Sequence, residues 1–299
     1  MSSKKKILFI INPVAGRRKR TNTGEMIRKY LDLEKYEPEI KYTEYQGHGA
    51  KLARKGIKRG VRIIVAVGGD GTVNEVASAV RDTEAALAII PAGSGNGLAR
   101  HMRLPLRPRQ AFNVLNNHKE VKIDYGLINK VPFFCTCGVG FDAFVGARFA
   151  EDGKRGFITY VKATLAEYAR YKPKKYTLTV GPRVVKKKAF LVTFANASQW
   201  GNNAFISPDA DIQDGYLDIC MLAPFPVIEA MGLGVRLFGK NIDESRYLDM
   251  VRSRHAILER NKPGPVHIDG EPGVMKRRLD ISVVHKGLRL VVPENSKFL

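Results

Sequence analysis

The segment Gly68-Gly69-Asp70-Gly71-Thr72 constrains this chain most, because it directly follows a run of β-forming residues, Val61 to Val67. The next residues, Thr72-Val73-Asn74-Glu75, have the S/T-x-x-E form of a helix capping box, with an apolar helical face behind them. The sequence therefore predicts a strand, a glycine loop and a helix in succession.

Asp70 lies in a loop that otherwise suits phosphate. Backbone N–H groups and the positive end of the helix dipole meet at a helix start, and glycines let a bulky ligand approach the backbone. A carboxylate would repel bare phosphate, so the loop indicates a metal–nucleotide complex with a divalent cation between the two. The alternative is a tight turn in which Asp70 and Thr72 only cap the helix.

Short apolar strands alternate with helices through the first part of the chain. We expect strands at residues 7–11, 39–45, 61–67 and 86–90, and helices at 23–33 and 49–58 and after the loops 68–72 and 93–97. This alternation predicts a doubly wound parallel α/β sheet, whose loops leave the carboxyl ends of the strands and converge on a ligand crevice. The loops 12–16, 68–72 and 93–96 should then lie together at one edge.

From Val121 onward the pattern changes to strands joined by short turns, with helices expected near 157–171 and 227–238. It predicts a second, mostly antiparallel β-sandwich domain. Two domains suit a chain of 299 residues. We expect residues 1–122 to form the α/β domain, residues 123–289 to form the sandwich, and a cleft to lie between them.

The net charge of +21 and a pI near 9.9 imply a polyanionic partner, either nucleic acid or an anionic membrane surface. No RNA-recognition, helix-turn-helix or zinc-finger signature is present, so nucleic acid is not expected and reversible, peripheral membrane binding is favoured. Any single basic cluster could also be a solvated loop. The clusters lie at residues 17–20, 172–175, 183 with 186–188, and 276–278.

The sequence shows no recognisable signal peptide and has few cysteines, which predicts a cytoplasmic protein. The apolar run Ile7–Ile11 is too short for a signal peptide. The most apolar stretch, Ile219–Gly239, is broken by prolines and charges, which predicts a strand followed by a buried or surface-docking helix instead of a membrane span. Cys135, Cys137 and Cys220 are too few for a disulfide framework or a four-ligand zinc site.

Two known architectures for phosphoryl transfer are excluded because their sequence motifs are absent. The chain has no G-x-x-x-x-G-K-[ST] loop and none of the protein-kinase elements. Aspartates stand beside glycines throughout the chain, and such hard oxygen ligands bind magnesium, although Asp-Gly is also a common turn dipeptide. These aspartates are Asp70, Asp124, Asp142, Asp214 and Asp269.

Three motifs follow one another along the first half of the chain: Asn12-Pro13-x-x-Gly16, Gly68-Gly69-Asp70-Gly71-Thr72-x-Asn74-Glu75 and Pro91-x-Gly93-Ser94-Gly95-Asn96. In this order and spacing they resemble the diacylglycerol kinase catalytic domain family, which includes soluble bacterial diacylglycerol kinases, sphingosine kinases and ceramide kinases. The motifs Gly138-x-Gly140-Phe141-Asp142 and Asp269-Gly270-Glu271 extend the similarity into the second half. The resemblance implies a first domain like those of phosphofructokinase and NAD kinase, a β-sandwich, ATP in the cleft, and a tail of about residues 290–299 that returns to the first domain.

The resemblance also implies roles for single residues. Asp269 would be the general base that takes the proton from a lipid hydroxyl, with Glu271 beside it. Asp70 would act in catalysis and, with Asp124, form a magnesium and water network that orients the phosphates. A second, structural magnesium site of some members is matched by Asp211 and Asp214. The residues that would line the nucleotide pocket are Asn12, Gly16, Thr43, Gly68, Gly69, Gly71, Thr72, Glu75, Ser94 and Asn96.

The chain departs from diacylglycerol kinases in its third loop. Ser94-Gly95-Asn96-Gly97 replaces the usual Gly-Thr-x-Asn-Asp and is closer to the sphingosine kinase form. We therefore expect an ATP- and magnesium-dependent kinase for diacylglycerol or a related lipid alcohol. The alternatives are a sphingoid-base kinase, an NAD kinase-like enzyme, or a non-catalytic nucleotide- or nucleic-acid-binding protein. The oligomeric state, including a homodimer, is left open.

Overall fold

The fold is that of a computed structural model, which describes residues 4–15, 23–145, 168 and 171–298. The chain divides into two compact units: unit 1 comprises residues 1–123 and 286–299, and unit 2 comprises residues 124–285. Two long strands, β5 (His118–Ile128) and β16 (Arg278–Pro293), each contribute to both units. The other elements of unit 1 are β1 (Lys5–Ile11), α1 (Thr23–Tyr30), β2 (Tyr36–Tyr42), α2 (His48–Lys58), β3 (Ile63–Gly68), α3 (Asp70–Val80), β4 (Ala86–Pro91), α4 (Gly97–His101) and α5 (Pro108–Asn116).

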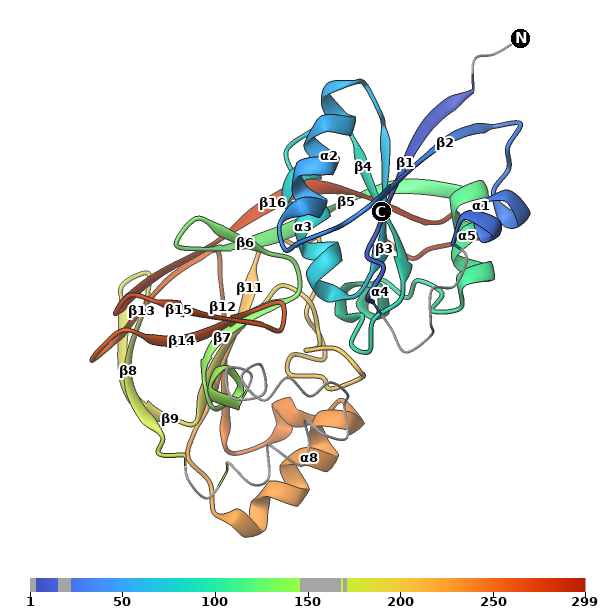
Figure 1. The fold of residues 1–299 in the computed structure, drawn as a ribbon. Coiled ribbons are helices and arrows are strands. Elements are labelled where there is room, and N and C mark those ends of the chain that lie inside the picture. Colours follow the sequence, from blue (N-terminus) through green and yellow to red (C-terminus); the bar gives the residue numbers. More distant parts are fainter. Residues whose placement is uncertain (1–3, 16–22, 146–167, 169–170, 299) are drawn as a thin grey trace. The chain divides into compact units, whose positions relative to one another are not determined.

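Unit 1 is a parallel sheet in the order β2-β1-β3-β4, extended by the last part of β16 beside β4. The central strands β3 and β4 are buried along their whole length, as expected where helices cover both faces of a parallel sheet. Helices α1 and α5 pack on one face, while α2 and α3 lie on the other (Figure 1). The predicted doubly wound α/β sheet is confirmed.

Unit 2 contains two antiparallel sheets. One has the order β12-β11-β10-β7-β14-β15, and in the other β13 lies between β16 and β8, with β9 beyond β8. The elements of unit 2 are β6 (Val131–Phe133), β7 (Thr136–Gly140), β8 (Lys174–Val180), β9 (Arg183–Ala189), β10 (Leu191–Ala195), β11 (Leu217–Leu222), η1 (Val227–Glu229), α8 (Ala230–Gly239), η2 (Ile242–Glu244), β12 (Leu248–Ser253), β13 (His255–Arg260), β14 (Gly264–Ile268) and β15 (Glu271–Met275).

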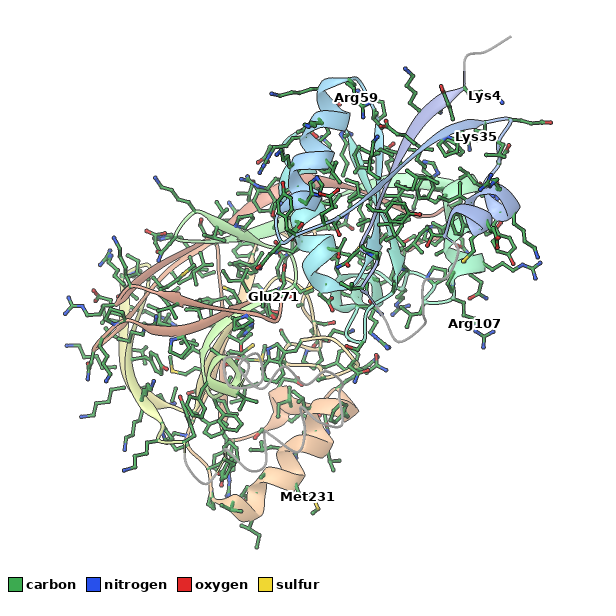
Figure 2. The ribbon with its side chains drawn as sticks, viewed as in Figure 1. Lys4, Lys35, Arg59, Arg107, Met231 and Glu271 are labelled. Atoms are coloured by element: carbon green, nitrogen blue, oxygen red, sulfur yellow. The ribbon has the colours of Figure 1, made fainter. Side chains whose placement is uncertain are left out.

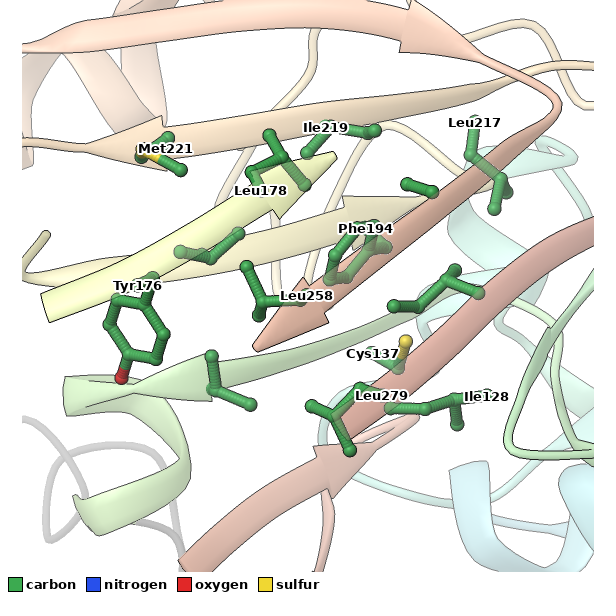
Figure 3. Close-up of a cluster of buried hydrophobic side chains, with 14 of the residues drawn as sticks. Ile128, Cys137, Tyr176, Leu178, Phe194, Leu217, Ile219, Met221, Leu258 and Leu279 are labelled. Carbon is green, nitrogen blue, oxygen red and sulfur yellow. The ribbon is translucent and has the colours of Figure 1, made fainter. Parts of the chain in front are cut away.

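The core of unit 2 lies between these two sheets. Phe194 and Ile219 of the first sheet pack in one cluster with Leu178, Leu258 and Leu279 of the second (Figure 3). Because alternate residues of a strand face opposite sides of a sheet, each strand contributes every second residue to this cluster. The predicted β-sandwich is confirmed.

Three strands of unit 2 and one helix of unit 1 were missed by the sequence patterns. Strand β9 is exposed on both faces over most of its length and carries Lys186, Lys187 and Lys188, so it lacks the apolar alternation that marks a half-buried strand. The others are β12, β15 and α5. The separate strands expected at 279–285 and 288–292 form one strand, β16.

Other expectations have mixed outcomes. The helix expected near 227–238 is found as η1 followed by α8. Most of the helix expected at 157–171 lies outside the described residues, as do the basic cluster 17–20 and Gly16. Cys135, Cys137 and Cys220 are buried, and no disulfide joins them. No helix in the described ranges is long and apolar enough to cross a membrane.

Candidate active site

The loops after β1, β3 and β4 of unit 1 meet at the carboxyl edge of its sheet, next to the end of β2. Asn12, just after β1, donates a hydrogen bond from Nδ2 to Thr72 Oγ1 in the first turn of α3, at 3.1 Å. Thr43, just after β2, donates its backbone N–H to the Ile11 carbonyl at 2.9 Å. The loop after β4 joins them through Ala92, whose N–H donates to the Gly68 carbonyl at 2.8 Å. The prediction that these loops lie together is confirmed.

Glycines make this close approach possible. A Cβ atom on Gly93 would lie 2.5 Å from Gly69 Cα, and one on Gly95 would lie 2.6 Å from Asp70 Oδ2. Gly68 is similarly enclosed, because a Cβ atom there would lie 2.5 Å from Thr72 Oγ1. The second and third loops therefore touch backbone to backbone, a packing that side chains would prevent.

The carboxylate of Asp70 joins the second loop to the third. Its Oδ2 accepts the Asn96 N–H at 2.8 Å, and its Oδ1 accepts the Gly97 N–H at 2.6 Å, at the start of α4. Burial raises the pKa of Asp70, and these two N–H groups oppose the rise because they stabilise the charged form. Asn96 itself adopts a left-handed conformation, with φ 51°, and its side chain bonds to both backbone groups of Gly93.

Asp70 fits one kind of magnesium site and not another. No three His, Cys, Asp or Glu side chains gather as a metal site within the described part of the chain. Each carboxylate oxygen of Asp70 accepts one backbone N–H and has a second lone pair. This donor set does not fit an all-protein cage, but it fits an ion whose other ligands are phosphate oxygens and water.

The capping box expected at Thr72 and Glu75 is wrong. Helix α3 begins at Asp70 with Gly69 as its N-cap, so Thr72 already lies within the first turn. The Glu75 carboxylate instead accepts the N–H groups of Gly47 and Gly49, at 2.6 and 2.9 Å. Glu75 therefore anchors the start of α2, where a negative carboxylate also interacts favourably with the positive end of the helix dipole. Ser94, at the tip of the third loop, is exposed.

Asp124, in unit 2, is fully buried and holds distant segments together. Its Oδ2 accepts the Gly215 N–H at 2.6 Å, and its Oδ1 lies 2.9 Å from His285 Nδ1. The Asn196 side-chain amide donates to its backbone carbonyl at 3.0 Å. These contacts give Asp124 a structural role of its own, beside the magnesium network that the family resemblance implies.

Asp124→Asn should lower the free energy of unfolding by about 2–3 kcal/mol, because a neutral amide replaces the buried carboxylate that accepts the Gly215 N–H and faces His285, and hydrogen bonds to a charged group contribute about 1.5–3 kcal/mol. Thermal unfolding with and without magnesium measures this. Asp280→Asn is the matched control, since Asp280 also lies near a histidine, His255 at 3.1 Å, but both are exposed; its cost should stay below about 0.5 kcal/mol. Unchanged stability in Asp124→Asn, with loss only of magnesium-dependent activity, would contradict the structural role.

Asp211 and Asp214 lie in one turn that Arg252 approaches. Asp211 Oδ1 accepts the Gln213 N–H at 2.9 Å, and Asp214 Oδ1 accepts the Tyr216 N–H at 2.8 Å. Arg252 lies 3.3 Å from Asp214 Oδ2 and 2.9 Å from Asp218 Oδ1. Burial raises the pKa of Asp214, and the Asp211 charge adds to the rise. A magnesium ion here would compete with the Arg252 guanidinium for Asp214.

Asp269 stands at the tip of a hairpin and reaches back to the start of β7. Asp269 and Gly270 form the two-residue turn between β14 and β15, with φ of 48° and 84°, values typical of a type I′ turn. Its carboxylate accepts three backbone N–H groups, from Phe134, Cys135 and Thr136, at 2.8, 2.7 and 3.1 Å. Glu271 follows as the exposed first residue of β15 (Figure 2).

A carboxylate–histidine pair beside Asp269 was not identified as a pair from the sequence. His267 Nε2 lies 2.9 Å from Asp142 Oδ2, and both side chains are about nine-tenths buried. The two atoms are close enough for an ion pair, but their geometry does not meet the requirements of a hydrogen bond. The only sequence signal for this pair is that His267 stands two residues before Asp269.

The same cluster surrounds Cys137 of β7. Its pKa lies well above the ordinary thiol value, because of burial and the charges of Asp269 and Asp142. Burial also raises the pKa of Tyr176 to about 12, and the Asp142 charge contributes to this rise. Three ionisable groups, Asp142, His267 and Asp269, thus adjoin the apolar interior of unit 2.

Comparison with known proteins gives consistent matches over both halves. The model of the "Diacylglycerol kinase catalytic domain" matches residues 6–128, and that of the "YegS C-terminal NAD kinase beta sandwich-like domain" matches residues 135–292. A "Probable lipid kinase YegS-like" of Pseudomonas aeruginosa is 31% identical over 266 residues, which cover 87% of this chain and 86% of the relative. A "Diacylglycerol kinase" of Mycobacterium tuberculosis is 32% identical over 183 residues, 58% of this chain and 59% of the relative.

The fold has close counterparts among solved structures. A diacylglycerol kinase from Bacillus anthracis str. Sterne superimposes with a TM-score of 0.74, covering 99% of this chain and 100% of that one. The two sequences are 19% identical, so this likeness concerns the fold.

Proposed function

The chain belongs to the diacylglycerol kinase catalytic domain family and is a lipid kinase, and we propose that it transfers the γ-phosphate of ATP to a lipid hydroxyl with the help of magnesium and of Asp269 as general base. The acceptor in this proposal is diacylglycerol or a related lipid alcohol, as the names of the relatives suggest.

The convergence of the three glycine-containing loops in unit 1 carries the proposal. The Gly69 and Gly93 backbones touch at the start of α3, and Asn12 and Asp70 fix the loops on either side. Helix N-termini lined by glycine present N–H groups at the carboxyl edge of the sheet, where phosphate binds in folds of this kind. We assign the ATP phosphates to this edge.

Magnesium bound with the nucleotide would neutralise phosphate charge and polarise the γ-phosphoryl group. Asp70 would hold water around that ion, since its carboxylate is fixed by two backbone N–H groups and cannot turn away. Asp70 does not take the substrate proton in this scheme.

Asp269 would accept the proton of the lipid hydroxyl. As the hydroxyl oxygen bonds to the γ-phosphorus, the bond from that phosphorus to the bridging oxygen of ADP breaks, and the proton moves to the Asp269 carboxylate. The three N–H donors of residues 134–136 hold the Asp269 carboxylate in one orientation. Phosphoryl transfer depends mainly on such positioning and on charge neutralisation.

Transfer of labelled γ-phosphate from ATP to a panel of lipids in mixed micelles tests the proposal. The panel contains diacylglycerol, monoacylglycerol, a sphingoid base and a phospholipid with a free hydroxyl, with NAD and RNA as controls. We expect label in a lipid, and only with magnesium present. Label in NAD alone would support an NAD kinase-like enzyme, and RNA binding without any labelled product would support a non-catalytic protein; either result would overturn the proposal.

A further inference from the structure

The segment of η1 and α8 exposes a continuous apolar face. Val227, Ile228, Met231, Val235 and Phe238 have exposed fractions of 70, 87, 82, 68 and 48%. Their spacing places them on one side of the helix, because residues three, four and seven apart share a face. Figure 2 shows the Met231 side chain pointing away from the body of unit 2. We call these five residues the α8 face.

The opposite side of α8 is part of the interior of unit 2. Leu233 is buried and Leu237 is partly buried against a cluster that contains Phe141, Tyr171 and Phe190. These aromatic rings contact one another, with Phe141 and Phe190 centroids 4.4 Å apart. Phe141 directly precedes Asp142, so apolar packing runs from the inner side of α8 to the neighbour of the Asp142–His267 pair.

No unpaired charge interrupts the α8 face. Between Val227 and Gly239 the only charged residues are Glu229 and Arg236, and both have partners. Glu229 pairs with Arg246 at 2.8 Å, and Arg236 pairs with Glu244 at 3.2 Å. Burying this face in an apolar medium would therefore not require desolvation of an isolated ion, which is the main cost of inserting a helix at an interface.

We propose that the α8 face inserts into the surface of the phospholipid bilayer from which the lipid substrate is drawn. The inference rests on the proposed function, because a lipid kinase must reach a membrane-embedded acceptor. Apolar side chains that a helix exposes are stabilised when they enter the boundary between the headgroups and the acyl chains of a bilayer, while the inner side of α8 stays packed in unit 2. The net charge of +21 adds long-range attraction to anionic lipids.

A second copy of the chain suits this face less well. A stable protein interface draws on about 20–30 residues from each partner, whereas the exposed large apolar residues here are five on one short helical segment. Their neighbours Gly232 and Gly234 leave open space where side chains would contact a protein partner. A bilayer is fluid and does not require a surface of complementary shape.

Vesicle co-sedimentation with the double variant Ile228→Ser/Met231→Ser tests the inference. Vesicles of phosphatidylcholine with phosphatidylglycerol should bind the variant about tenfold more weakly than the wild type, at high salt as well as low, because the lost term is apolar. The matched control is Val184→Ser/Val274→Ser, which changes two residues exposed to 58 and 77% on strands β9 and β15. The control should bind like the wild type. Equal binding by all three proteins would overturn the inference.

Insertion has a second, direct readout. Met231→Trp in a Trp200→Phe background places the only tryptophan of the chain on the α8 face. Its emission should shift to shorter wavelength on binding vesicles and be quenched by brominated acyl chains. A protein that binds vesicles with no shift and no quenching would exclude insertion of this face.

These tests separate the inference from the proposed function. With a short-chain diacylglycerol dispersed as monomers, the Ile228→Ser/Met231→Ser variant should transfer phosphate at the wild-type rate. If the wild type labels lipid but the variant binds vesicles normally, the inference fails and the kinase assignment stands. If no lipid is labelled while α8-dependent binding is present, only the proposed reaction fails. Sedimentation velocity compares the oligomeric states of the two proteins. A wild type that is dimeric and a variant that is monomeric would assign the face to self-association and overturn the inference.

Discussion

Asp269→Asn should lower turnover by about a hundredfold or more, the loss expected when a general base is removed, while ATP still binds. The amide keeps the size of the side chain, and its oxygen can still accept the Cys135 and Thr136 N–H groups, which both bond to Oδ1 of Asp269. It cannot take a proton from a hydroxyl at neutral pH. Rate measurements at saturating lipid and calorimetric ATP binding on the same preparation give the comparison.

A structural role for Asp269 would give a different result. The carboxylate clamps the β14–β15 hairpin to the start of β7, so a structural loss would appear as a lower unfolding temperature and a turnover reduced only in proportion to the folded fraction. Unfolding temperature and turnover, measured on the same preparation of the variant, separate the two roles. Near-normal turnover would remove Asp269 from the reaction.

Glu271→Gln measures what the neighbouring carboxylate contributes. Glu271 is exposed and pairs through its backbone with Ile268 across the same hairpin. A loss far smaller than that of Asp269→Asn would leave Asp269 as the base. An equal loss would indicate that the two carboxylates act as one unit, in which case the double variant should be no slower than either single variant.

Gly93→Ala should abolish most nucleotide binding, with an affinity for ATP at least about tenfold weaker and activity reduced in parallel. The added Cβ atom would lie 2.5 Å from Gly69 Cα, and backbone cannot move aside as a side-chain end can. The loops after β3 and β4 would separate, and overpacking of this kind costs about 1–3 kcal/mol. ATP titration and thermal unfolding of the variant measure the two effects.

Gly234→Ala on α8 is the matched control, because a Cβ atom there meets nothing within 4 Å. Alanine in a helix interior is favoured over glycine by about 1 kcal/mol, so this variant should be as stable as the wild type or more so and should bind ATP normally. If Gly93→Ala also binds ATP normally, the nucleotide does not depend on the approach of these two loops, and the assignment of the phosphates to this edge is wrong.

The charge of the chain is unevenly divided between the units. Unit 1 carries 27 Lys and Arg against 12 Asp and Glu, while unit 2 carries 23 against 17. An excess of basic charge on a unit raises the local concentration of anionic ligands around it. Electrostatic attraction to a membrane would thus come mainly from unit 1, and apolar insertion from the α8 face of unit 2.

The order of strands, glycine loops and helices could be predicted from local patterns. Runs such as Ile63–Val67 and Ala86–Ile90 are long enough and apolar enough to be buried strands, and alternation with helices allows few arrangements other than a parallel sheet. Strand β9 escaped prediction because its side chains lack a clear apolar alternation. The edge strand β9 is basic and mostly exposed to solvent. Alternation of apolar and polar residues arises where one face of a strand is buried, and most of β9 has no buried face. Helix α5 does carry an apolar face, made of Ala111, Phe112 and Leu115, so its helical period could have predicted it.

The sequence by itself determined that this chain forms a doubly wound α/β sheet and a β-sandwich and that its glycine loops follow the carboxyl ends of strands, because periodicity and turn residues are local properties. Tertiary structure alone decided which partners the carboxylates take: Glu75 anchors α2 instead of capping its own helix, and Asp124 binds Gly215 and faces His285. It also decided which side of α8 stays exposed. A carboxylate accepts whichever N–H group the fold brings within about 3 Å, and residues distant in sequence meet there only after folding.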